Sequence, residues 1–305
     1  MSDKLKGKVA IVTGSGQGIG RGIALALGKE GAKVITNNRK PGTPGGDAES
    51  TAREIRDLGG KAMPFFGDVS KFEIGEKIVQ AAVDNFGRLD ILVNNGGFDM
   101  PHIIWNMTEE DWDICLDSYL KGAFNCTRFA AAIMKQQRWG RILNTSSNAW
   151  LGTTGHSNYG AAKAGLVGFS RSIARELGRF GITCNAFTPH AATRFTLDDT
   201  VRAGYKRRYE LGLMSKEDLD KRLNQPPPET MGPFIAYLCT DEAGDINGQV
   251  LDVDWNKVSL WSEPVKVSTI SKDKAKGDWT VEELIELVPK KLLVGYENPA
   301  PVQPL

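Results

Sequence analysis

Residues 13–20 read Thr-Gly-Ser-Gly-Gln-Gly-Ile-Gly, and this stretch decides the fold class. The apolar run 8–13 leads into it and predicts a β-strand, while the amphipathic stretch that follows predicts a helix. Glycines in such a turn let backbone amides approach a pyrophosphate, and the helix N-terminus supplies partial positive charge. A flexible turn without a ligand is the alternative. The strand before it and the helix after it favour a dinucleotide site.

Short apolar runs alternate with longer helical patterns along most of the chain, which is typical of repeated strand–helix–strand units. Seven runs predict strands, at 8–13, 33–36, 62–66, 89–94, 141–145, 182–187 and 249–253. We therefore predict a single doubly wound α/β fold of the Rossmann type, with about seven parallel strands and helices on both faces. The helix predicted over 160–177 has apolar and small residues on more than one face, so we expect it to pack against the sheet and a second subunit.

The alternation stops after residue 254, which suggests a boundary. We expect residues 1–260 to form the dinucleotide-binding catalytic domain and residues 261–305 to form a C-terminal extension. In the extension, Thr280 and Glu283 have capping-box spacing ahead of an apolar run, which predicts one short amphipathic helix. Between the last two predicted strands, the charged segment at about 194–229 is expected to be a substrate loop.

Charge and composition narrow the partners. The chain has 38 basic and 37 acidic residues, a formal net charge of +1, so no net field attracts nucleic acid or an anionic membrane. Its start is too charged for a signal peptide, and no apolar run is long enough to span a membrane. We expect a cytoplasmic protein with a small-molecule substrate. The four cysteines are widely separated in apolar segments, so we expect buried thiols and no metal site: Cys115, Cys126, Cys184 and Cys239.

Polar and small residues follow the second, third and fourth predicted strands, at the edge where doubly wound sheets bind ligands. Asp68 can accept a hydrogen bond from an adenine amino group, and the small residues at 94–97 let the chain pass close to a ribose. Ordinary turn chemistry is the alternative for each segment. With the glycine turn, the expected cofactor contacts are Gly14, Ser15, Gln17, Gly18, Ile19, Asn38, Arg39, Asp68, Val69, Asn95, Gly96 and Gly97.

The end of the second predicted strand bears on the choice of cofactor. A cofactor without a 2′-phosphate normally meets an Asp or Glu here, but this chain has Asn38 followed by Arg39 and Lys40. A neutral Asn does not repel a 2′-phosphate, and the two cations can pair with one. We therefore expect NADP to be preferred, with NAD possible. Two solvated surface side chains are the alternative reading of Arg39 and Lys40.

Tyr159 and Lys163 lie four residues apart, on one face of the predicted helix. A free tyrosine has a pKa of about 10, so proton exchange near neutral pH needs a neighbouring cation that stabilises the phenolate. Lys163 can supply that cation. An incidental pair on a helix is the alternative.

Several motifs occur together in a fixed order, and their ensemble resembles the short-chain dehydrogenase/reductase family. They are the glycine turn, Asp68, residues 94–97, Ser146-Ser147 and the Tyr159/Lys163 pair, and the resemblance runs from about residue 6 to residue 254. The segment 184–196 is also similar to the dehydrogenase unit of peroxisomal multifunctional D-hydroxyacyl-CoA enzymes and of bacterial relatives.

The resemblance implies an NAD(P)-dependent oxidoreductase that interconverts a secondary alcohol and a ketone. It implies that Tyr159 exchanges the proton, that Lys163 holds the nicotinamide ribose and lowers the tyrosine pKa, and that a serine binds the substrate oxygen. The family's usual spacing selects Ser146, whereas the end of the fifth strand selects Ser147. We prefer Ser147, because loops lose residues more easily than strands shift. The remaining cofactor contacts that the resemblance implies are Pro189, His190, Ala192 and Thr193.

Two departures from the family pattern stand out. Tyr119 replaces an Asn whose main-chain carbonyl is thought to bind a water leading to the lysine, and any residue keeps that carbonyl. His190 replaces the usual glycine after Pro189, where it either contacts the substrate or the cofactor or packs within a loop. We assign no chemistry to His102 or His156.

The resemblance places 3-hydroxyacyl-CoA and 3-oxoacyl thioesters first among substrates, followed by steroid-like hydroxyls. From the apolar faces of the helix predicted over 160–177, we also expect a homodimer or homotetramer. One alternative is a non-catalytic dinucleotide-binding protein or partner subunit with the same fold, against which the intact Tyr159/Lys163 pair argues. Another is an epimerase that returns its cofactor unchanged.

Overall fold

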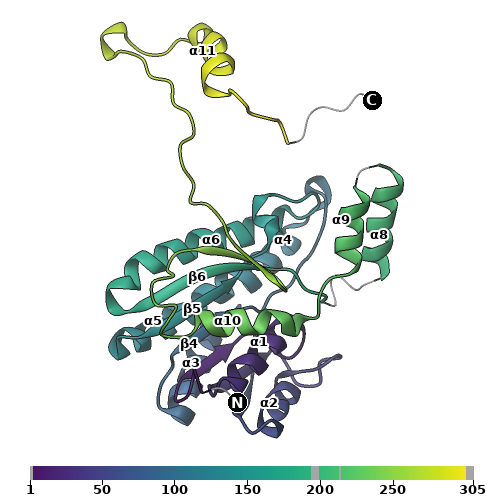
Figure 1. Cartoon of the computed structure of the whole chain (residues 1–305), viewed down its shortest axis with the longest axis vertical. Coiled ribbons are helices and arrows are strands. Elements are labelled where there is room, and N and C mark those ends of the chain that lie inside the picture. The colour runs from purple at the N-terminus through teal and green to yellow at the C-terminus, as the bar shows by residue number, and fades with distance from the viewer. Residues whose placement is uncertain (1–2, 194–198, 213, 300–305) are drawn as a thin grey trace. The chain divides into compact units, whose positions relative to one another are not determined.

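Strand β1 lies inside one sheet whose strands follow the order β3-β2-β1-β4-β5-β6-β7-β8 (Figure 1). The computed structural model describes residues 3–193, 199–212 and 214–299. Strands β1 to β7 pair in parallel, and β8 pairs with β7 in the antiparallel direction. In these ranges the strands are β1 (Val9–Val12), β2 (Lys33–Asn38), β3 (Lys61–Phe66), β4 (Ile91–Asn94), β5 (Gly140–Thr145), β6 (Ile182–Pro189), β7 (Val250–Asp254) and β8 (Lys257–Leu260).

This order confirms the predicted doubly wound sheet. The chain moves outward from β1 through β2 to β3 and then returns to place β4 on the other side of β1, so the order reverses between β1 and β4. Ligands bind at such a switch point, beyond the carboxyl ends of the strands. The eighth strand adds to the seven predicted. All four of its residues are exposed, so no buried apolar run marked it in the sequence.

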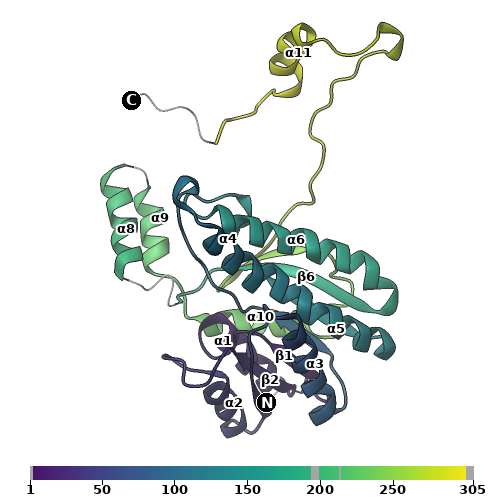
Figure 2. The same cartoon turned by 180° about the vertical axis from the view of Figure 1, so that it is seen from behind.

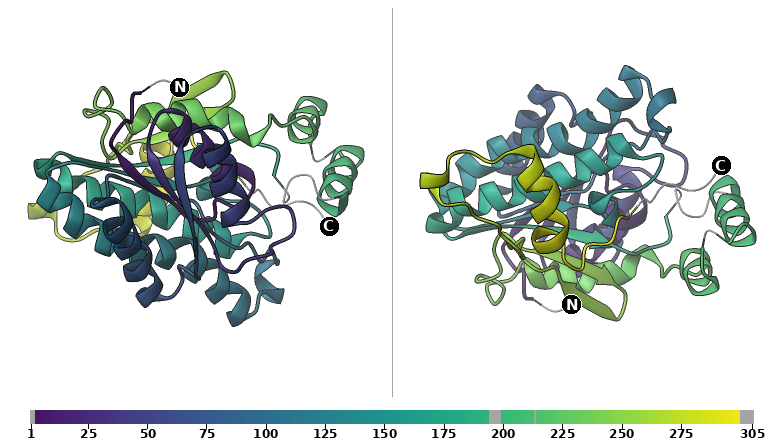
Figure 3. Two further views of the ribbon diagram at one scale, coloured as in Figure 1. Left: turned by 90° about the horizontal axis from the view of Figure 1, so that it is seen from below. Right: turned by 90° about the horizontal axis from the view of Figure 1, so that it is seen from above.

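Helices cover both faces of the sheet (Figures 2 and 3). Residues of β1 alternate between the faces: Ala10 and Val12 belong to one apolar core, and Val9 and Ile11 to the other. The first core packs under α1 (Gly18–Lys29), α2 (Ala48–Asp57) and α10 (Gly232–Leu238), the second under α3 (Phe72–Phe86), α5 (Gly122–Gln137) and α6 (Ser157–Leu177).

Across the described ranges, no helix is both long and apolar enough to cross a membrane.

Helix α4 (Glu109–Leu116) leads to α5 through a π-helical turn, η2 (Asp117–Lys121). Thr108 and Asp111 form a capping box that begins α4. A π-helical turn inserts an extra residue into a helix and is frequent at functional sites. In this chain it carries Tyr119.

The expected substrate loop contains two helices, α8 (Asp199–Glu210) and α9 (Lys216–Leu223). Ser215 caps α9, because its hydroxyl oxygen accepts a hydrogen bond from the Asp218 backbone N–H. Residues 194–198 of the predicted loop lie outside the described residues, as does residue 213.

The chain divides into two compact units, Met1–Trp261 and Ser262–Leu305. The second unit contains α11 (Val281–Leu287). The Thr280 hydroxyl accepts a hydrogen bond from the Glu283 backbone, and the Glu283 side chain accepts one from the Thr280 backbone. The capping box predicted from the sequence is therefore confirmed. The four cysteines are buried free thiols, as predicted.

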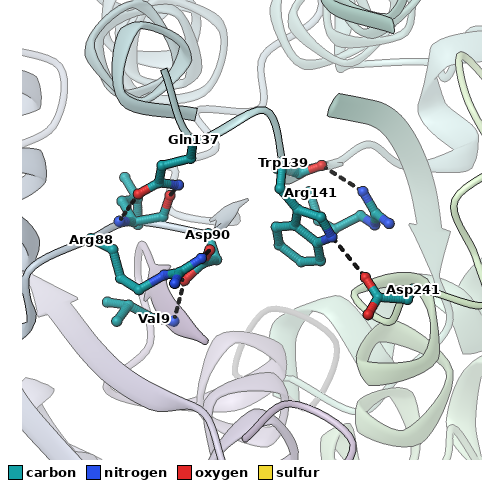
Figure 4. Close-up of polar contacts among 9 residues, drawn as sticks. Val9, Arg88, Asp90, Gln137, Trp139, Arg141 and Asp241 are labelled. Atoms are coloured by element: carbon teal, nitrogen blue, oxygen red, sulfur yellow. Dashed lines mark hydrogen bonds and ion pairs between the residues drawn. The ribbon is translucent and has the colours of Figure 1, made fainter. Parts of the chain in front are cut away.

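A polar network closes the amino-terminal edge of the sheet (Figure 4). Asp90 is fully buried, and its carboxylate accepts hydrogen bonds from the Val9 backbone N–H at 2.9 Å and from Arg88 at 2.6 and 2.8 Å. Gln137 bonds both the N–H and the carbonyl of Leu89. The donors and acceptors of this network therefore satisfy one another within the fold.

Candidate active site

The glycine turn joins β1 to α1 at the carboxyl edge of the sheet. Gly14 and Gly18 have φ angles of 62° and 57°, and a Cβ on Gly14 would lie 2.6 Å from the Gly96 Cα. Within the described residues, the N-cap Gln17 makes no side-chain capping bond, and no acidic residue stands in the first turn of α1. The first amides of α1 therefore remain available to an anion. These features fit a dinucleotide pyrophosphate.

The neighbouring strand ends hold this turn in place. The Thr13 hydroxyl accepts hydrogen bonds from the backbone N–H groups of Asn95 and Gly96 at 2.9 and 3.0 Å. The Asn95 amide donates to the carbonyls of Thr13 and Gly14. Ser15 is fully buried, and its hydroxyl accepts from the Asn37 backbone. Ser15 and Asn95, two of the predicted cofactor residues, thus shape the turn through their side chains.

The predicted adenosine end lies around Asn38. Its side-chain oxygen is buried, has no hydrogen-bond partner in the described residues, and leaves no room for a Cβ on Gly16. The Arg39 guanidinium stacks over the Phe98 ring, 4.3 Å from its centroid. Asp68 accepts a hydrogen bond from the Ser70 backbone, and Val69 beside it is buried. The buried amide oxygen is a place where a ligand hydroxyl could donate.

The segment after β6 returns to the glycine turn. The Ala192 backbone N–H donates to the Pro226 carbonyl at 2.7 Å, and the Thr193 methyl lies 4.0 Å from where a Gly18 Cβ would stand. The structure thus brings Thr193 and the glycine turn together, as expected for two parts of one cofactor site.

Tyr159 and Lys163 lie side by side on α6. Lys163 is 2% exposed, and its ammonium donates to the Thr145 carbonyl at 2.6 Å. The lysine Nζ lies 5.3 Å from the centroid of the Tyr159 ring. Burial lowers the pKa of Lys163 to about 7, and the nearby Cys115 and Asp99 oppose that shift. Burial raises the pKa of Tyr159 to about 12, and a side-chain hydrogen bond with Ser147 opposes that rise.

The two candidate serines have different surroundings. Ser146 is buried, and its hydroxyl donates to the Lys163 backbone carbonyl at 3.0 Å, which ties β5 to α6. Ser147 forms the hydrogen bond with the Tyr159 side chain. The structure therefore places Ser147 at the phenol and commits Ser146 to a structural contact. The assignment of the substrate contact to Ser147 stays a prediction.

Tyr119 packs against both members of the pair. Its ring meets the Tyr159 ring edge to face, with centroids 5.3 Å apart, and the Lys163 Nζ lies 3.9 Å from the Tyr119 centroid. A Cβ on Gly97 would overlap the Tyr119 ring, so only glycine fits at that position. The sequence pointed to the main-chain carbonyl of Tyr119, but the ring makes these contacts.

His190 is joined to a residue that the sequence analysis did not single out. Its Nε2 lies 2.9 Å from an Asp252 carboxylate oxygen on β7, and the same oxygen accepts from the Thr188 hydroxyl at 2.5 Å. The Asn148 amide nitrogen lies 3.1 Å from the His190 Nε2. The Asp252 hydrogen bond raises the pKa of His190, although burial opposes the rise. Asp252 therefore links the ends of β6 and β7 to the loop that carries Ser147.

A second pair was also missed, near Tyr159. The His156 Nε2 lies 3.2 Å from the Asp99 carboxylate, and its Nδ1 lies 3.2 Å from the Thr154 carbonyl. Both partners are acceptors, so only an imidazolium can donate to both. The pKa of His156 is raised, chiefly by Asp99. Asp99 follows the small-residue segment at the end of β4, and this position at the ligand edge was a usable signal.

Comparisons with known proteins agree with this geometry. The model of the short chain dehydrogenase family matches residues 8–202. Peroxisomal multifunctional enzyme type 2 of Drosophila melanogaster is 38% identical over 253 residues, which cover 81% of this chain and 38% of that protein. The mouse enzyme of the same name is also 38% identical, and the match covers 32% of it. The chain thus spans only about a third of these multifunctional proteins.

Shorter relatives match over most of their length. Hydroxyacyl-CoA dehydrogenase ChsB1 of Mycobacterium tuberculosis is 34% identical over 286 residues, which cover 90% of this chain and 86% of that protein. The crystal structure of a short chain dehydrogenase from Mycobacterium avium superposes with a TM-score of 0.80 at 34% identity, over 98% of this chain and 99% of that one.

Proposed function

This chain belongs to the short-chain dehydrogenase family, and from that premise we propose that it oxidises 3-hydroxyacyl-CoA thioesters, or reduces the 3-oxo compounds, with NADP. The family places the chain among oxidoreductases that use a nicotinamide dinucleotide to interconvert a secondary alcohol and a ketone. The observation that carries the proposed mechanism is the unbroken line of contacts from Ser147 through Tyr159 to the buried Lys163.

In this mechanism each side chain has a defined task. The nicotinamide supplies the hydride acceptor or donor. Ser147 holds the substrate oxygen beside the Tyr159 side chain, whose phenolate takes the alcohol proton in oxidation and whose phenol returns it in reduction. Lys163 stabilises the phenolate and, with a second N–H, can hold a ribose hydroxyl. Water is excluded at the lysine, because its side chain is almost fully buried.

Burial opposes ionisation of the Tyr159 phenol, so a nearby cation is needed to stabilise the phenolate. A tyrosine pKa of about 12 leaves the phenol protonated at neutral pH, whereas catalysis of oxidation needs a base. An ammonium close to the ring favours the phenolate, and its own pKa of about 7 leaves it partly charged near neutrality. We therefore expect activity in the oxidative direction to rise with pH through the titration of the coupled pair.

The choice of NADP rests on the charges near Asn38. Arg39 stacks on Phe98 at the edge of the turn, Lys40 follows it, and Asn38 itself is neutral. The nearby Asp47 is occupied as a cap, because its two carboxylate oxygens accept from the Ser50 and Gly42 backbones. The test compares kcat/KM for NADP and NAD. Asn38→Asp should move the preference toward NAD, and a wild-type preference for NAD would refute the choice.

The substrate class rests on the names of two relatives, hydroxyacyl-CoA dehydrogenase ChsB1 and the (2S)-[(R)-hydroxy(phenyl)methyl]succinyl-CoA dehydrogenase subunit BbsD of Thauera aromatica. We would offer 3-oxobutyryl-CoA and a steroid-like cyclic ketone with NADPH and follow oxidation of the cofactor. Preferred reduction of the thioester supports the proposal, and preference for the cyclic ketone moves the substrate to the second class. Binding of NADPH without turnover of any ketone would favour a non-catalytic dinucleotide-binding protein. Epimerisation without net oxidation would favour an epimerase.

We further propose a cytoplasmic homodimer or homotetramer. A groove between α6 and the α4–η2–α5 stretch is lined mainly by apolar and small residues, Leu116, Leu120, Phe124, Gly165 and Phe169, together with the charged Asp117 and Lys121. Phe124 is 44% exposed, so this face has apolar surface to offer a second copy. Light scattering should give two or four chains for the wild type and a smaller particle for Phe124→Glu. A wild-type monomer would contradict the assembly.

A further inference from the structure

The buried ammonium of Lys163 needs more support than its one backbone hydrogen bond. An ammonium has three N–H donors, and one of them donates to the Thr145 carbonyl at 2.6 Å. The nearest aromatic face is that of Tyr119, whose centroid lies 3.9 Å from the Nζ, compared with 5.3 Å for Tyr159. A cation at this distance from a ring face is attracted to its negative face, most strongly where water is excluded.

The Tyr119 ring is fixed in this position from three sides. It belongs to the π-helical turn η2, which sets it between α4 and α5. It packs against the Tyr159 ring at an interplanar angle of 70°. It also lies against the backbone of Gly97, where the ring occupies the space that a Cβ would need. The ring is 8% exposed, so the contact is shielded from solvent.

Other groups that face Lys163 do not replace this contact. Asp99, from the loop after β4, and Cys115, from α4, both favour the charged lysine, while burial opposes it. Cys115 is itself a neutral thiol at neutral pH, because burial raises its pKa to about 12. One oxygen of the Asp99 carboxylate is engaged with His156.

We propose that the aromatic ring of Tyr119 is a positioning element that holds the Lys163 ammonium, charged and in place, against the Tyr159 phenol by a cation–π contact. This inference rests on the proposed acid/base function of Tyr159 and Lys163. It assigns the function to the ring face and not to the backbone carbonyl of residue 119. The family pattern that has Asn here offers no such face.

The proposal predicts the direction in which the pH profile of oxidation shifts when the Tyr119 ring is removed. Without the ring, the charged lysine loses an attraction while its burial remains, so its pKa falls further. A lysine that is more often neutral stabilises the phenolate less, and the pKa of Tyr159 rises. The acid limb of the oxidation profile then moves to higher pH.

Two matched variants separate the ring face from simple packing. Tyr119→Leu keeps an apolar side chain but removes the face, and we expect kcat for alcohol oxidation to fall about tenfold, with the acid limb about one pH unit higher. Returning a ring at this position, in Tyr119→Phe, should restore most of the rate and the wild-type limb. If Tyr119→Leu melts at a much lower temperature than the wild type, Tyr119→Met serves as the second ring-free variant.

A measurement without turnover makes the test independent of substrate. The Lys163 Nζ resonance in ¹⁵N-lysine-labelled protein, assigned by its loss in Lys163→Met, reports the lysine titration directly. We expect a lower pKa in Tyr119→Leu than in Tyr119→Phe. Equal titrations and equal pH profiles in the two variants would overturn the proposal. If the wild type reduces no ketone at all, the proposed function fails, and the NMR comparison still decides the role of the ring.

Discussion

Two groups of buried polar residues, one at each edge of the sheet, differ in whether their oxygens are satisfied. At the amino edge, the fully buried Asp90 is saturated by Val9 and Arg88 (Figure 4). At the carboxyl edge, Asn38 and Asp99 each keep a buried side-chain oxygen for which the described residues supply no partner. Unsatisfied buried groups cost free energy, so they persist where a ligand or a reaction uses them. The Asp90 network thus serves stability, whereas the open acceptors on Asn38 and Asp99 serve chemistry.

The sharpest test of this contrast is to remove the phenol oxygen of Tyr159 at the carboxyl edge. Tyr159→Phe should lower kcat about 10³-fold, because the acid/base group is lost while the ring and its packing remain. Affinity for NADPH, measured by calorimetry, and the melting temperature should stay close to wild type. A variant with substantial turnover would remove Tyr159 from the mechanism.

The adjacent serines provide a matched pair at the same edge. Ser147→Ala should lower kcat about 10²-fold, because a donor to the reacting oxygen is lost. Ser146→Ala should lose about 1 kcal/mol of folding free energy, because its hydroxyl serves the Lys163 carbonyl, and should change kcat far less. Steady-state kinetics with urea unfolding of both variants measures this. The reverse order of kcat losses would transfer the role to Ser146.

A substitution at the amino edge should lower the folding free energy and leave kcat unchanged. Asp90→Ala should cost about 1–3 kcal/mol of folding free energy, because the buried Val9 N–H loses its acceptor. The kcat of the folded fraction should be unchanged. Arg88→Gln, at an arginine that is 43% exposed, should cost less. A drop in kcat for folded Asp90→Ala would break the separation between the edges.

Structural features that involve residues close together in the sequence were predictable from the sequence. The glycine turn, the Tyr159/Lys163 pair and the capping box at Thr280 each involve residues a few positions apart, so a pattern reveals them. The paired residues His190 and Asp252 were not predictable, because they meet only after β6 and β7 pair with Thr188 opposite Asp252. The contacts of the Tyr119 ring were missed because its partners lie in two segments distant from it in the sequence, α6 and the loop after β4.

The smallest expected effect is on the stability that His156 contributes at the carboxyl edge. The pKa of His156 is raised by Asp99, so its ion pair stabilises the fold below the unfolded-state pKa of about 6.5. That contribution is lost as the pH rises through the folded-state value. The difference in unfolding free energy between wild type and His156→Gln should therefore be about 1 kcal/mol at low pH and shrink at high pH. A difference that grows with pH would contradict the imidazolium.

The central claim is that the carboxyl edge brings a nicotinamide and a substrate carbonyl together for direct hydride transfer. The most direct measurement is mass spectrometry of the alcohol formed from the best ketone of the panel with NADPH deuterated at nicotinamide C4. With the transferred position labelled, we predict one deuterium at the carbinol carbon of the product, and about 10³-fold slower formation of that product by Tyr159→Phe at the same enzyme concentration. A product without deuterium from either labelled face of the cofactor, or tight NADPH binding with no ketone reduced, would contradict the account.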